Sequence, residues 1–319
     1  MKRRFFCMLI ALLSLLPLGC GTGTPDAYSA TGFACDTVVT ITAYASKETV
    51  DNAMRLCADY EAVLSKTVEG SDIWKLNHAN GAPVEVDPET AALLQLAIKI
   101  GEESGGAFDV TIAPASALWD FAADEPALPD PDALSAAAAR VDWRNIVIDG
   151  TTVTLRNGAE IDLGGIAKGY IADRVADYLR SEGVSSACIN MGGNVVAVGN
   201  KPDGSAWRIG LRDPNGTAAQ SEEVLSLSDA AIVTSGNYER FFDLDGVRYH
   251  HILDPKTGMP VQNGLASVTI IGSESALCDA LSTACFLLGK EGSKALLDRY
   301  GVRAIFLYSD GTRAEYPER

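Results

Sequence analysis

Hydrophobic and polar residues follow two different periods along this chain, which predicts a mixture of strands and helices. Residues 37–44 (Thr-Val-Val-Thr-Ile-Thr-Ala-Tyr) form a β-branched run that is typical of a strand. Between Val50 and Leu64 apolar residues recur at helical spacing, so we expect an amphipathic helix over residues 47–65. The two periods therefore appear within the first sixty-five residues.

Local start and turn signals place further elements. Asp87-Pro88 opens a helix that should run to about Ile100, and Asp130-Pro131 opens a second one that should run to about Arg140. The acidic, proline-rich stretch 120–131 is expected to be a surface loop. We also expect hairpins turning at Asp149-Gly150, Asp245-Gly246 and Asp310-Gly311, helices over about 166–180, 274–288 and 291–300, and strands near 186–190, 194–198, 206–212, 229–234 and 267–271.

The alternation of strands, helices and hairpins predicts the fold class. Hairpins join antiparallel neighbours, so we favour an α+β fold with mixed, largely antiparallel sheets and packed helices over a doubly wound parallel sheet. The chain has 319 residues, 47% of them hydrophobic, which is enough for a well-buried core. No internal repeat is visible, and we expect one folded domain over residues 32–319.

The N-terminus has the pattern of an export signal. Lys2-Arg3-Arg4 precedes an apolar stretch, residues 5–18, that is short for a membrane span. The small residue before Cys20 is similar to a bacterial lipobox, although Pro17 stands where a leucine is usual. We expect a lipoprotein signal peptide over residues 1–19 and a lipidated (palmitate-bearing) Cys20. The alternative is an ordinary secretory signal with a chance cysteine.

Lipidation would place the protein at the extracytoplasmic face of the cell membrane. The Gly/Thr-rich residues 20–31 would then be a flexible tether. The formal net charge is −16, and removal of the three basic signal residues leaves −19. So acidic a protein repels nucleic-acid phosphates, which excludes a nucleic-acid partner. Five cysteines remain after the signal, with no CxxC spacing, so neither a disulfide framework nor a zinc site is expected, and a single disulfide in an oxidising compartment is the alternative.

The first candidate site is the helical stretch Asp279-Ala-Leu-Ser282-Thr283-Ala. Asp279 and Thr283 are four residues apart and therefore share one helix face. A carboxylate and a hydroxyl on one face suit a hard cation such as Mg²⁺, which prefers oxygen ligands. An ordinary exposed helix residue is the alternative for Asp279.

Three glycine-containing clusters could bind an anion. Residues 162–170 (Asp-Leu-Gly-Gly-Ile-Ala-Lys-Gly-Tyr) lie before a helix, whose N-terminus favours anions. Residues 190–194 (Asn-Met-Gly-Gly-Asn) and 234–240 (Thr-Ser-Gly-Asn-Tyr-Glu-Arg) each follow a strand. The alternatives are purely structural turns, a solvated Lys168, and an Arg240 that pairs with a nearby acid.

Two further clusters offer a base and an aromatic face. His250 and His251 end a strand, and strand alternation allows only one of them in a given pocket. Either histidine could act as a general base near neutral pH or be hydrogen-bonded in the core or a turn. The second cluster is Gly105-Gly-Ala-Phe-Asp-Val-Thr111. Phe108 could stack on the ring of a ligand, and Asp109 could accept a hydrogen bond from a ligand hydroxyl. The alternative is a helix cap followed by a core strand.

The ordered series of these motifs resembles the ApbE family, the FAD:protein FMN transferases. The resemblance covers nearly the whole mature chain, and it includes Cys35-Asp-Thr and His251-Ile-Leu-Asp-Pro-Lys-Thr-Gly. It implies an α+β fold with a central flavin cleft and Mg²⁺ on the pyrophosphate, with Mn²⁺ or Ca²⁺ possible. The implied metal ligands are Gly165 (carbonyl), Asp279, Ser282 and Thr283. The implied FAD contacts are Cys35, where the family often has Met, Ala107, Phe108, Asp109, Asp162, Lys168 and Ile252.

The resemblance also implies a reaction, in which FMN passes from FAD to a Thr or Ser hydroxyl of an acceptor flavoprotein and AMP is released. His251 and Asp279 would be the catalytic residues. The implied acceptors are subunits of Rnf or sodium-translocating NADH:quinone reductase complexes, or extracellular flavin-carrying reductases. Two alternatives remain open, an FAD pyrophosphatase that forms FMN and AMP and a lipoprotein that only binds FAD.

Overall fold

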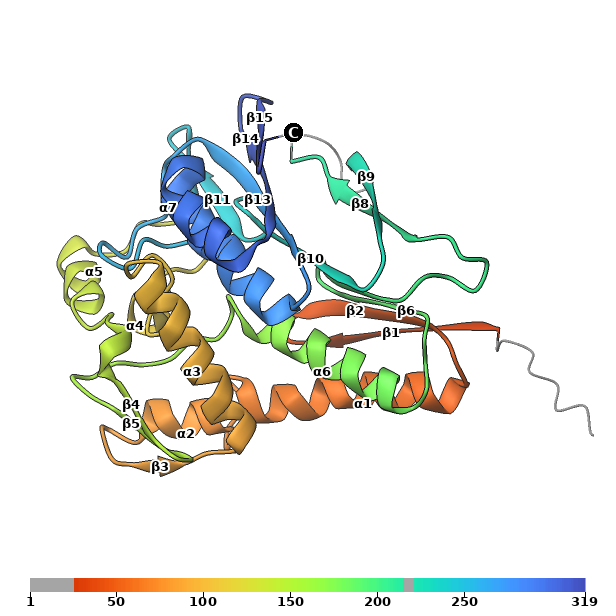
Figure 1. Cartoon of the computed structure of the whole chain (residues 1–319). Helices are drawn as coiled ribbons and strands as arrows, with labels where there is room; N and C mark the ends of the chain where they lie inside the picture. Colours follow the sequence, from red (N-terminus) through yellow and green to blue (C-terminus); the bar gives the residue numbers. More distant parts are fainter. Residues whose placement is uncertain (1–25, 215–220, 319) are drawn as a thin grey trace, which may run out of the picture.

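The computed structural model describes residues 26–214 and 221–318 (Figure 1). The signal peptide and Cys20 lie outside the described residues, so their assignments stay predictions. No helix in the described ranges is long and apolar enough to cross a membrane.

An antiparallel sheet of eight strands forms the centre of the fold. Its order is β1-β2-β6-β7-β10-β13-β14-β15, and every neighbouring pair is antiparallel. This arrangement confirms the α+β class and the preference for antiparallel pairing. The strands are β1 (Ala27–Ala34), β2 (Thr37–Tyr44), β6 (Ala187–Met191), β7 (Asn194–Val198), β10 (Ala230–Gly236), β13 (Leu265–Gly272), β14 (Arg303–Tyr308) and β15 (Arg313–Tyr316).

Helices cover one face of this sheet (Figure 1). The helices α1 (Lys47–Leu64) and α6 (Ala167–Ser181) pack beside each other, and α7 (Ser275–Tyr300) lies against β10 and β13. A fourth helix, α3 (Pro88–Glu103), packs on α7. The largest hydrophobic core lies between the sheet and these helices and includes the fully buried Phe286 and Phe306.

The other face of the sheet is covered in part by a two-stranded ribbon, β8 (Trp207–Arg212) and β9 (Ser221–Leu227). Burial on both faces explains why all five residues of β7, Asn-Val-Val-Ala-Val, are buried. Val196 and Val198 belong to the helix-side core, whereas Val195 and Ala197 pack with Trp207 in a second, smaller core.

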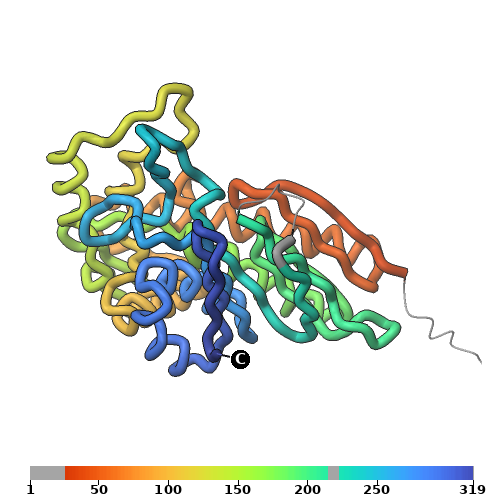
Figure 2. The backbone as a smooth tube through the Cα atoms, turned by 90° about the horizontal axis from the view of Figure 1, so that it is seen from above, coloured from red at the N-terminus to blue at the C-terminus, as the bar shows by residue number. Residues whose placement is uncertain are grey.

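Smaller elements surround the end of the sheet near the site. They are α2 (Asp72–His78), β3 (Val84–Glu85), α4 (Ala113–Ser116), α5 (Pro131–Ala138), the 3₁₀-helix η1 (Trp143–Asn145), β4 (Ile146–Asp149), β5 (Thr152–Leu155), β11 (Phe241–Leu244) and β12 (Val247–His250). Stacked rings of Trp119, Phe121, Phe242 and Tyr249 join the segment after α4 to the β11–β12 hairpin. In Figure 2 this segment and the β1–β2 hairpin lie at opposite sides of the molecule.

Two expectations about boundaries were wrong. The tether predicted for residues 20–31 overlaps β1, because cross-strand pairing with β2 already begins at Ala27. The helix expected to stop before Gly101 continues to Glu103 and ends at Ser104. The two helices expected on either side of residue 289 are confirmed: α7 consists of two helical halves joined at a kink, where Gly289 leaves the helical geometry at φ 68° and ψ 173°.

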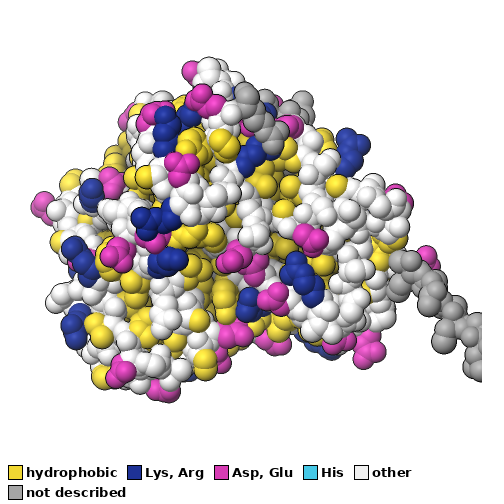
Figure 3. All heavy atoms as spheres, viewed as in Figure 1, with side chains coloured by type: hydrophobic (Ala, Val, Ile, Leu, Met, Phe, Trp, Pro, Cys, Tyr) yellow, Lys and Arg dark blue, Asp and Glu magenta, His cyan; other side chains and the backbone are white. Residues whose placement is uncertain are grey.

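Acidic and basic side chains are interspersed on the face seen in Figure 3. This face therefore offers no continuous basic surface of the kind that binds nucleic-acid backbones.

Candidate active site

The helices α6 and α7 cross so closely that only glycine fits between them. A Cβ atom on Gly169 would overlap the carbonyl oxygen of Ser275. At this crossing Asp279 Oδ2 accepts a hydrogen bond of 2.9 Å from the backbone N–H of Gly169. Asp279 is buried, and its other carboxylate oxygen lies 3.8 Å from Lys168 Nζ. The first turn of α6 thus fixes the orientation of the Asp279 carboxylate.

Asp173 on α6 caps the N-terminus of α7. Its carboxylate oxygens accept from the backbone N–H groups of Ser275 (2.9 Å) and Ala276 (2.8 Å), while the N-cap residue Glu274 makes no side-chain cap. Burial raises the Asp173 pKa to about 6 despite these two donors. The cap from another helix holds the register of α7, and with it Asp279, against α6.

Three hydroxyl groups gather beside Asp279. Ser235 Oγ, at the end of β10, lies 2.7 Å from Ser282 Oγ and 3.3 Å from Thr283 Oγ1. Gly165 faces this group, because a Cβ built on it would lie 3.3 Å from Thr283 Oγ1 and 3.2 Å from the Phe108 ring. The structure therefore brings Gly165, Asp279, Ser282 and Thr283 together, and it adds Ser235, which the sequence offered only as part of an anion-binding loop.

This donor set fits a hard divalent cation. It combines one buried carboxylate with several hydroxyls beside a glycine backbone, all of them oxygen ligands. The described residues contain no group of three or more His, Cys, Asp or Glu side chains suited to a metal. A site in this protein must therefore rely on hydroxyl and carbonyl oxygens, and on its ligand, to complete the coordination.

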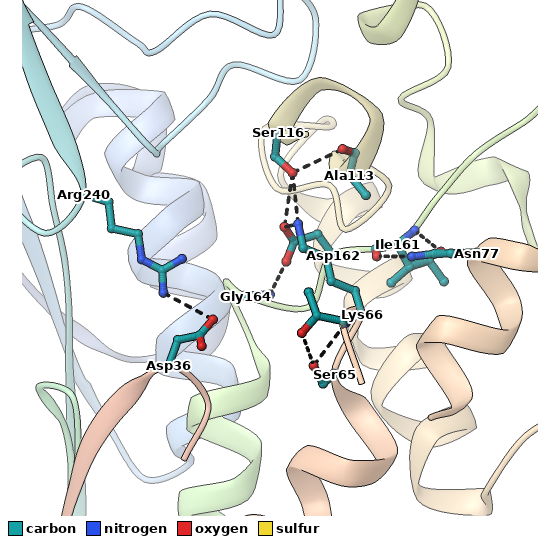
Figure 4. Close-up of polar contacts among 11 residues, drawn as sticks. Asp36, Ser65, Lys66, Asn77, Ala113, Ser116, Ile161, Asp162, Gly164 and Arg240 are labelled. Carbon is teal, nitrogen blue, oxygen red and sulfur yellow. Dashed lines mark hydrogen bonds and ion pairs between the residues drawn. The ribbon is translucent and has the colours of Figure 1, made fainter. Parts of the chain in front are cut away.

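A second polar cluster surrounds Asp162, just before the glycine turn (Figure 4). Asp162 Oδ2 accepts from Lys66 Nζ at 2.6 Å and from Ser116 Oγ at 3.3 Å, and its Oδ1 accepts from the Gly164 N–H at 2.9 Å. Burial alone would raise the pKa of this carboxyl, but Lys66 and the hydrogen bonds outweigh it and lower the pKa. Lys66 and Ser116 come from distant segments, and no motif had indicated them.

The glycine turn also binds the lysine that follows it. Lys168 Nζ donates to the Gly164 carbonyl oxygen at 2.9 Å while remaining near Asp279. Asp162, Gly164, Lys168 and Asp279 therefore form one connected series of contacts, from the Lys66 cluster to the α6–α7 crossing.

Asp109 is placed differently from a free ligand-binding carboxylate. It is buried and accepts from Thr111 N–H (2.8 Å), Thr111 Oγ1 (2.7 Å) and Trp143 N–H (2.9 Å). Burial raises its pKa above the usual range, although these donors oppose the shift. The side chain organises the local loop, and the ring of the neighbouring Phe108 is what the loop presents toward Gly165.

The two adjacent histidines have different environments, as strand alternation predicted. His250 is buried; its Nε2 lies 3.0 Å from the Val261 carbonyl oxygen, and its Nδ1 accepts from the Ile252 N–H at 3.3 Å. Both ring nitrogens are engaged, which confirms the structural alternative for His250. His78, whose Nδ1 lies 2.7 Å from the Trp74 carbonyl oxygen, is also locally bonded. Ile252 is buried beside this pair.

His251 is accessible to solvent. The His251 backbone N–H donates to the Arg240 carbonyl oxygen at 3.1 Å. The surrounding protein desolvates its ring, and His250, Lys168 and Arg240 repel its positive form, so its pKa is lowered to about 4. At neutral pH the imidazole is therefore uncharged and able to accept a proton.

The tip of the β1–β2 hairpin forms the opposite side of the site. Cys35 and Asp36 occupy left-handed conformations, at φ 53° and 55°, and Asp36 lies 4.0 Å from the Arg240 guanidinium (Figure 4). Burial first, and then nearby Glu61, raise the Cys35 pKa to about 12, although the charge of Lys168 opposes the shift. Cys35 is thus a neutral thiol near the glycine turn.

The Asn190–Asn194 motif supports this tip as a structural turn. A Cβ on Gly192 would overlap the Thr37 hydroxyl, and the Gly192 N–H donates to the Val38 carbonyl oxygen at 3.1 Å. Gly192 therefore lets the β6–β7 turn pack directly on the hairpin tip.

Comparison with known proteins agrees with this arrangement. The sequence profile of the ApbE family matches residues 35–306. The FAD:protein FMN transferase of Treponema pallidum is 40% identical over 279 residues, which cover 82% of this chain and 77% of that protein. The one from Klebsiella pneumoniae is 40% identical over 258 residues, covering 79% and 80%.

Solved structures share the fold. The ApbE protein of Thermotoga maritima superposes with a TM-score of 0.83 at 34% identity, covering 92% of this chain and 97% of that one. The apo flavinyl transferase ApbE of Pseudomonas stutzeri gives a TM-score of 0.81 at 29% identity, covering 92% and 95%. The match over most of the chain, in sequence and in structure, shows that this protein belongs to the ApbE family.

Proposed function

We propose that this protein transfers FMN from FAD to a Thr or Ser hydroxyl of an acceptor protein and releases AMP. Its relatives carry the name FAD:protein FMN transferase at up to 40% identity. The observation on which the proposal rests is the meeting of Asp279, Ser282, Thr283 and Ser235 at the Gly165 turn. Oxygen ligands of this kind suit a divalent cation bound to a pyrophosphate.

Mg²⁺, or Mn²⁺ or Ca²⁺ in its place, would be held by Asp279, Ser282, Thr283 and the Gly165 carbonyl. When bound, such an ion neutralises phosphate charge and orients the displacement. Lys168 adds a positive charge beside the same position. FAD would contact Cys35, Ala107, Phe108, Asp162, Lys168 and Ile252, with Asp109 acting through the shape of its loop.

The transfer itself needs a base for the incoming hydroxyl. The acceptor oxygen bonds to the phosphorus on the FMN side, the bond from that phosphorus to the AMP oxygen breaks, and AMP leaves with the electron pair. His251 takes the proton of the attacking hydroxyl, for which its uncharged imidazole is suited. His250 cannot do this, because both of its ring nitrogens are engaged.

One assay separates this function from its two alternatives. The purified protein is incubated with FAD, Mg²⁺ and the soluble domain of a flavin-carrying Rnf subunit, followed by denaturing electrophoresis. A fluorescent acceptor band and stoichiometric AMP indicate transfer. FMN and AMP without a fluorescent band would indicate a pyrophosphatase, and bound FAD without AMP would indicate a flavin-binding protein.

The partners and location follow the same proposal. Acceptors would be flavoproteins of the Rnf or sodium-translocating NADH:quinone reductase type, or extracellular reductases. The lipid anchor on Cys20 would hold the enzyme at the extracytoplasmic face of the membrane. Substitution Cys20→Ala should release the protein from the membrane fraction, and its retention there would contradict the anchor.

A further inference from the structure

The two most exposed large hydrophobic side chains among the described residues lie directly opposite each other on the β1–β2 hairpin. Phe33 is 72% exposed and Val38 is 57% exposed, and they form a cross-strand pair. They flank the turn residues Cys35 and Asp36. We call Phe33 and Val38 the apolar pair.

The apolar pair adjoins the candidate active site. Between its two members lies Cys35, which is influenced by the charge of Lys168, and Asp36, which is 4.0 Å from Arg240. The Arg240 carbonyl oxygen in turn accepts from the His251 N–H at 3.1 Å. A short series of contacts therefore leads from the turn between the apolar pair to His251, the proposed base, and Figure 4 shows its Asp36–Arg240 step.

The backbone under the pair is held in place. The Gly192 N–H bonds the Val38 carbonyl oxygen, and the β6–β7 turn packs on Thr37 without a side chain between them. Eight cross-strand pairs join β1 to β2 up to the turn. Exposed apolar side chains on a rigid backbone lose little conformational freedom on binding, which favours their use as contact residues.

We infer that the apolar pair is the docking contact for the acceptor protein. It would bind the acceptor surface next to the acceptor's own Thr or Ser that receives FMN. The inference rests on the proposed function, because only a reaction with a protein substrate requires a macromolecule to approach His251 from outside. A folded acceptor whose hydroxyl reaches His251 must pass close to this tip. The apolar pair would pack against an apolar side chain of the acceptor that lies near its modified Thr or Ser.

Charge argues against the other occupants. The chain carries a formal charge of −16, which disfavours an anionic membrane surface, and Asp36 at the turn adds a negative charge beside the pair. A second copy would bring the same negative charge to the interface. A neutral or basic acceptor surface carries no such penalty.

The test compares Phe33→Thr and Val38→Thr, which keep residues suited to a strand, with Val224→Thr as matched control. Val224 is 47% exposed on β9, outside the site. For each protein we would measure FAD affinity, and FMN transfer against concentration of the soluble Rnf-subunit domain. We expect each tip variant to raise KM for the acceptor about fivefold or more, with unchanged FAD affinity and an unaffected control.

Each other outcome has one meaning. If wild-type protein transfers FMN and the tip variants keep its KM for the acceptor, the docking inference is wrong while the proposed function stands. If the wild type transfers no FMN, the proposed function and the docking inference are both wrong. Light scattering that finds a dimer dissolved by the tip substitutions, or vesicle binding lost with them, would assign the pair to a second copy or to a membrane and overturn the inference.

Discussion

The buried side of the site, at the α6–α7 crossing, and its open side, around Arg240, differ in how firmly their side chains are held by other parts of the protein. On the buried side, Asp279, Ser282 and Gly169 are held by one another and by the α6–α7 crossing. On the open side, Asp36, Arg240 and His251 are exposed, and the one ion pair spans 4.0 Å. A charged phosphate and its metal need fixed ligands, whereas a protein substrate needs access, and the difference between the sides matches these two requirements.

The largest effect should come from the buried side. Asp279→Ala removes the only carboxylate of the proposed metal site and leaves the Gly169 N–H without its acceptor. We expect FMN transfer to fall by about three orders of magnitude or more, because a bound metal supplies several kcal/mol of stabilisation to the transition state. The check is in-gel flavin fluorescence across a Mg²⁺ titration, with the exposed Glu291→Ala on the same helix as control. Wild-type transfer by the Asp279 variant would contradict a carboxylate-dependent metal site.

The histidine pair tests the open side. His251→Ala should slow transfer by about 10²–10⁴-fold and leave FAD affinity unchanged, because only the base for the hydroxyl is lost. His250→Ala should instead lower the free energy of unfolding by about 1–3 kcal/mol, since it leaves buried partners unsatisfied, while the folded fraction stays active. Stopped-time assays and urea denaturation measure the two effects. If the two variants behaved alike, the separation of the two sides would fail.

The pH dependence should reflect the lowered pKa of His251. Its pKa in the folded protein is about 4, whereas the ordinary value is near 6.5. Between these two pH values an unperturbed histidine becomes protonated and can no longer accept a proton, but the His251 imidazole still can. The acid limb of kcat/KM should therefore fall near pH 4 to 5. A limb centred at 6.5 would mean that the surrounding protein does not desolvate this ring.

The smallest effect concerns the Lys66–Asp162 pair, which borders the buried side. Its partners are part-exposed, at 35% and 21%, so Lys66→Met should cost only about 1 kcal/mol of unfolding free energy at pH 7. Because the Asp162 pKa is lowered in the folded state, this contribution exists above the ordinary aspartate pKa and disappears as the pH falls through the lowered value. The difference from wild type in urea denaturation should therefore shrink at acid pH. An unchanged difference would assign the effect to packing.

Much of the fold could be predicted because its signals are local. The Asp-Pro helix starts were predictable because each aspartate caps the helix that follows it directly. Asp87 and Asp130 both accept a hydrogen bond from a backbone N–H two or three residues further on. The elements that were missed depend on tertiary contacts. The strand β1 is rich in small residues and is held by its pairing with β2. The short helix α2 is fixed by the Asn77 side chain, which bonds the Ile161 backbone.

The site shows the same division. Asp279 and Thr283 could be paired from sequence because helical spacing puts them on one face. Lys66, Ser116 and the contact of Ser235 with Ser282 could not, because segments far apart in the chain meet there only after folding. The role of Asp109 was also hidden, since its three donors come from a turn and from the start of η1.

The break at Gly289 has a mechanical consequence for the enzyme. Residues 275–288 carry every proposed metal-binding side chain of the helix, and the continuous hydrogen-bonded cylinder stops directly after them. The distal half, in which Asp298 accepts a hydrogen bond from the Tyr316 hydroxyl on β15, can therefore bend about Gly289 independently of the first half. The half that carries the proposed metal ligands, held against α6 through Asp279 and the Asp173 cap, can then keep its position when the distal half moves.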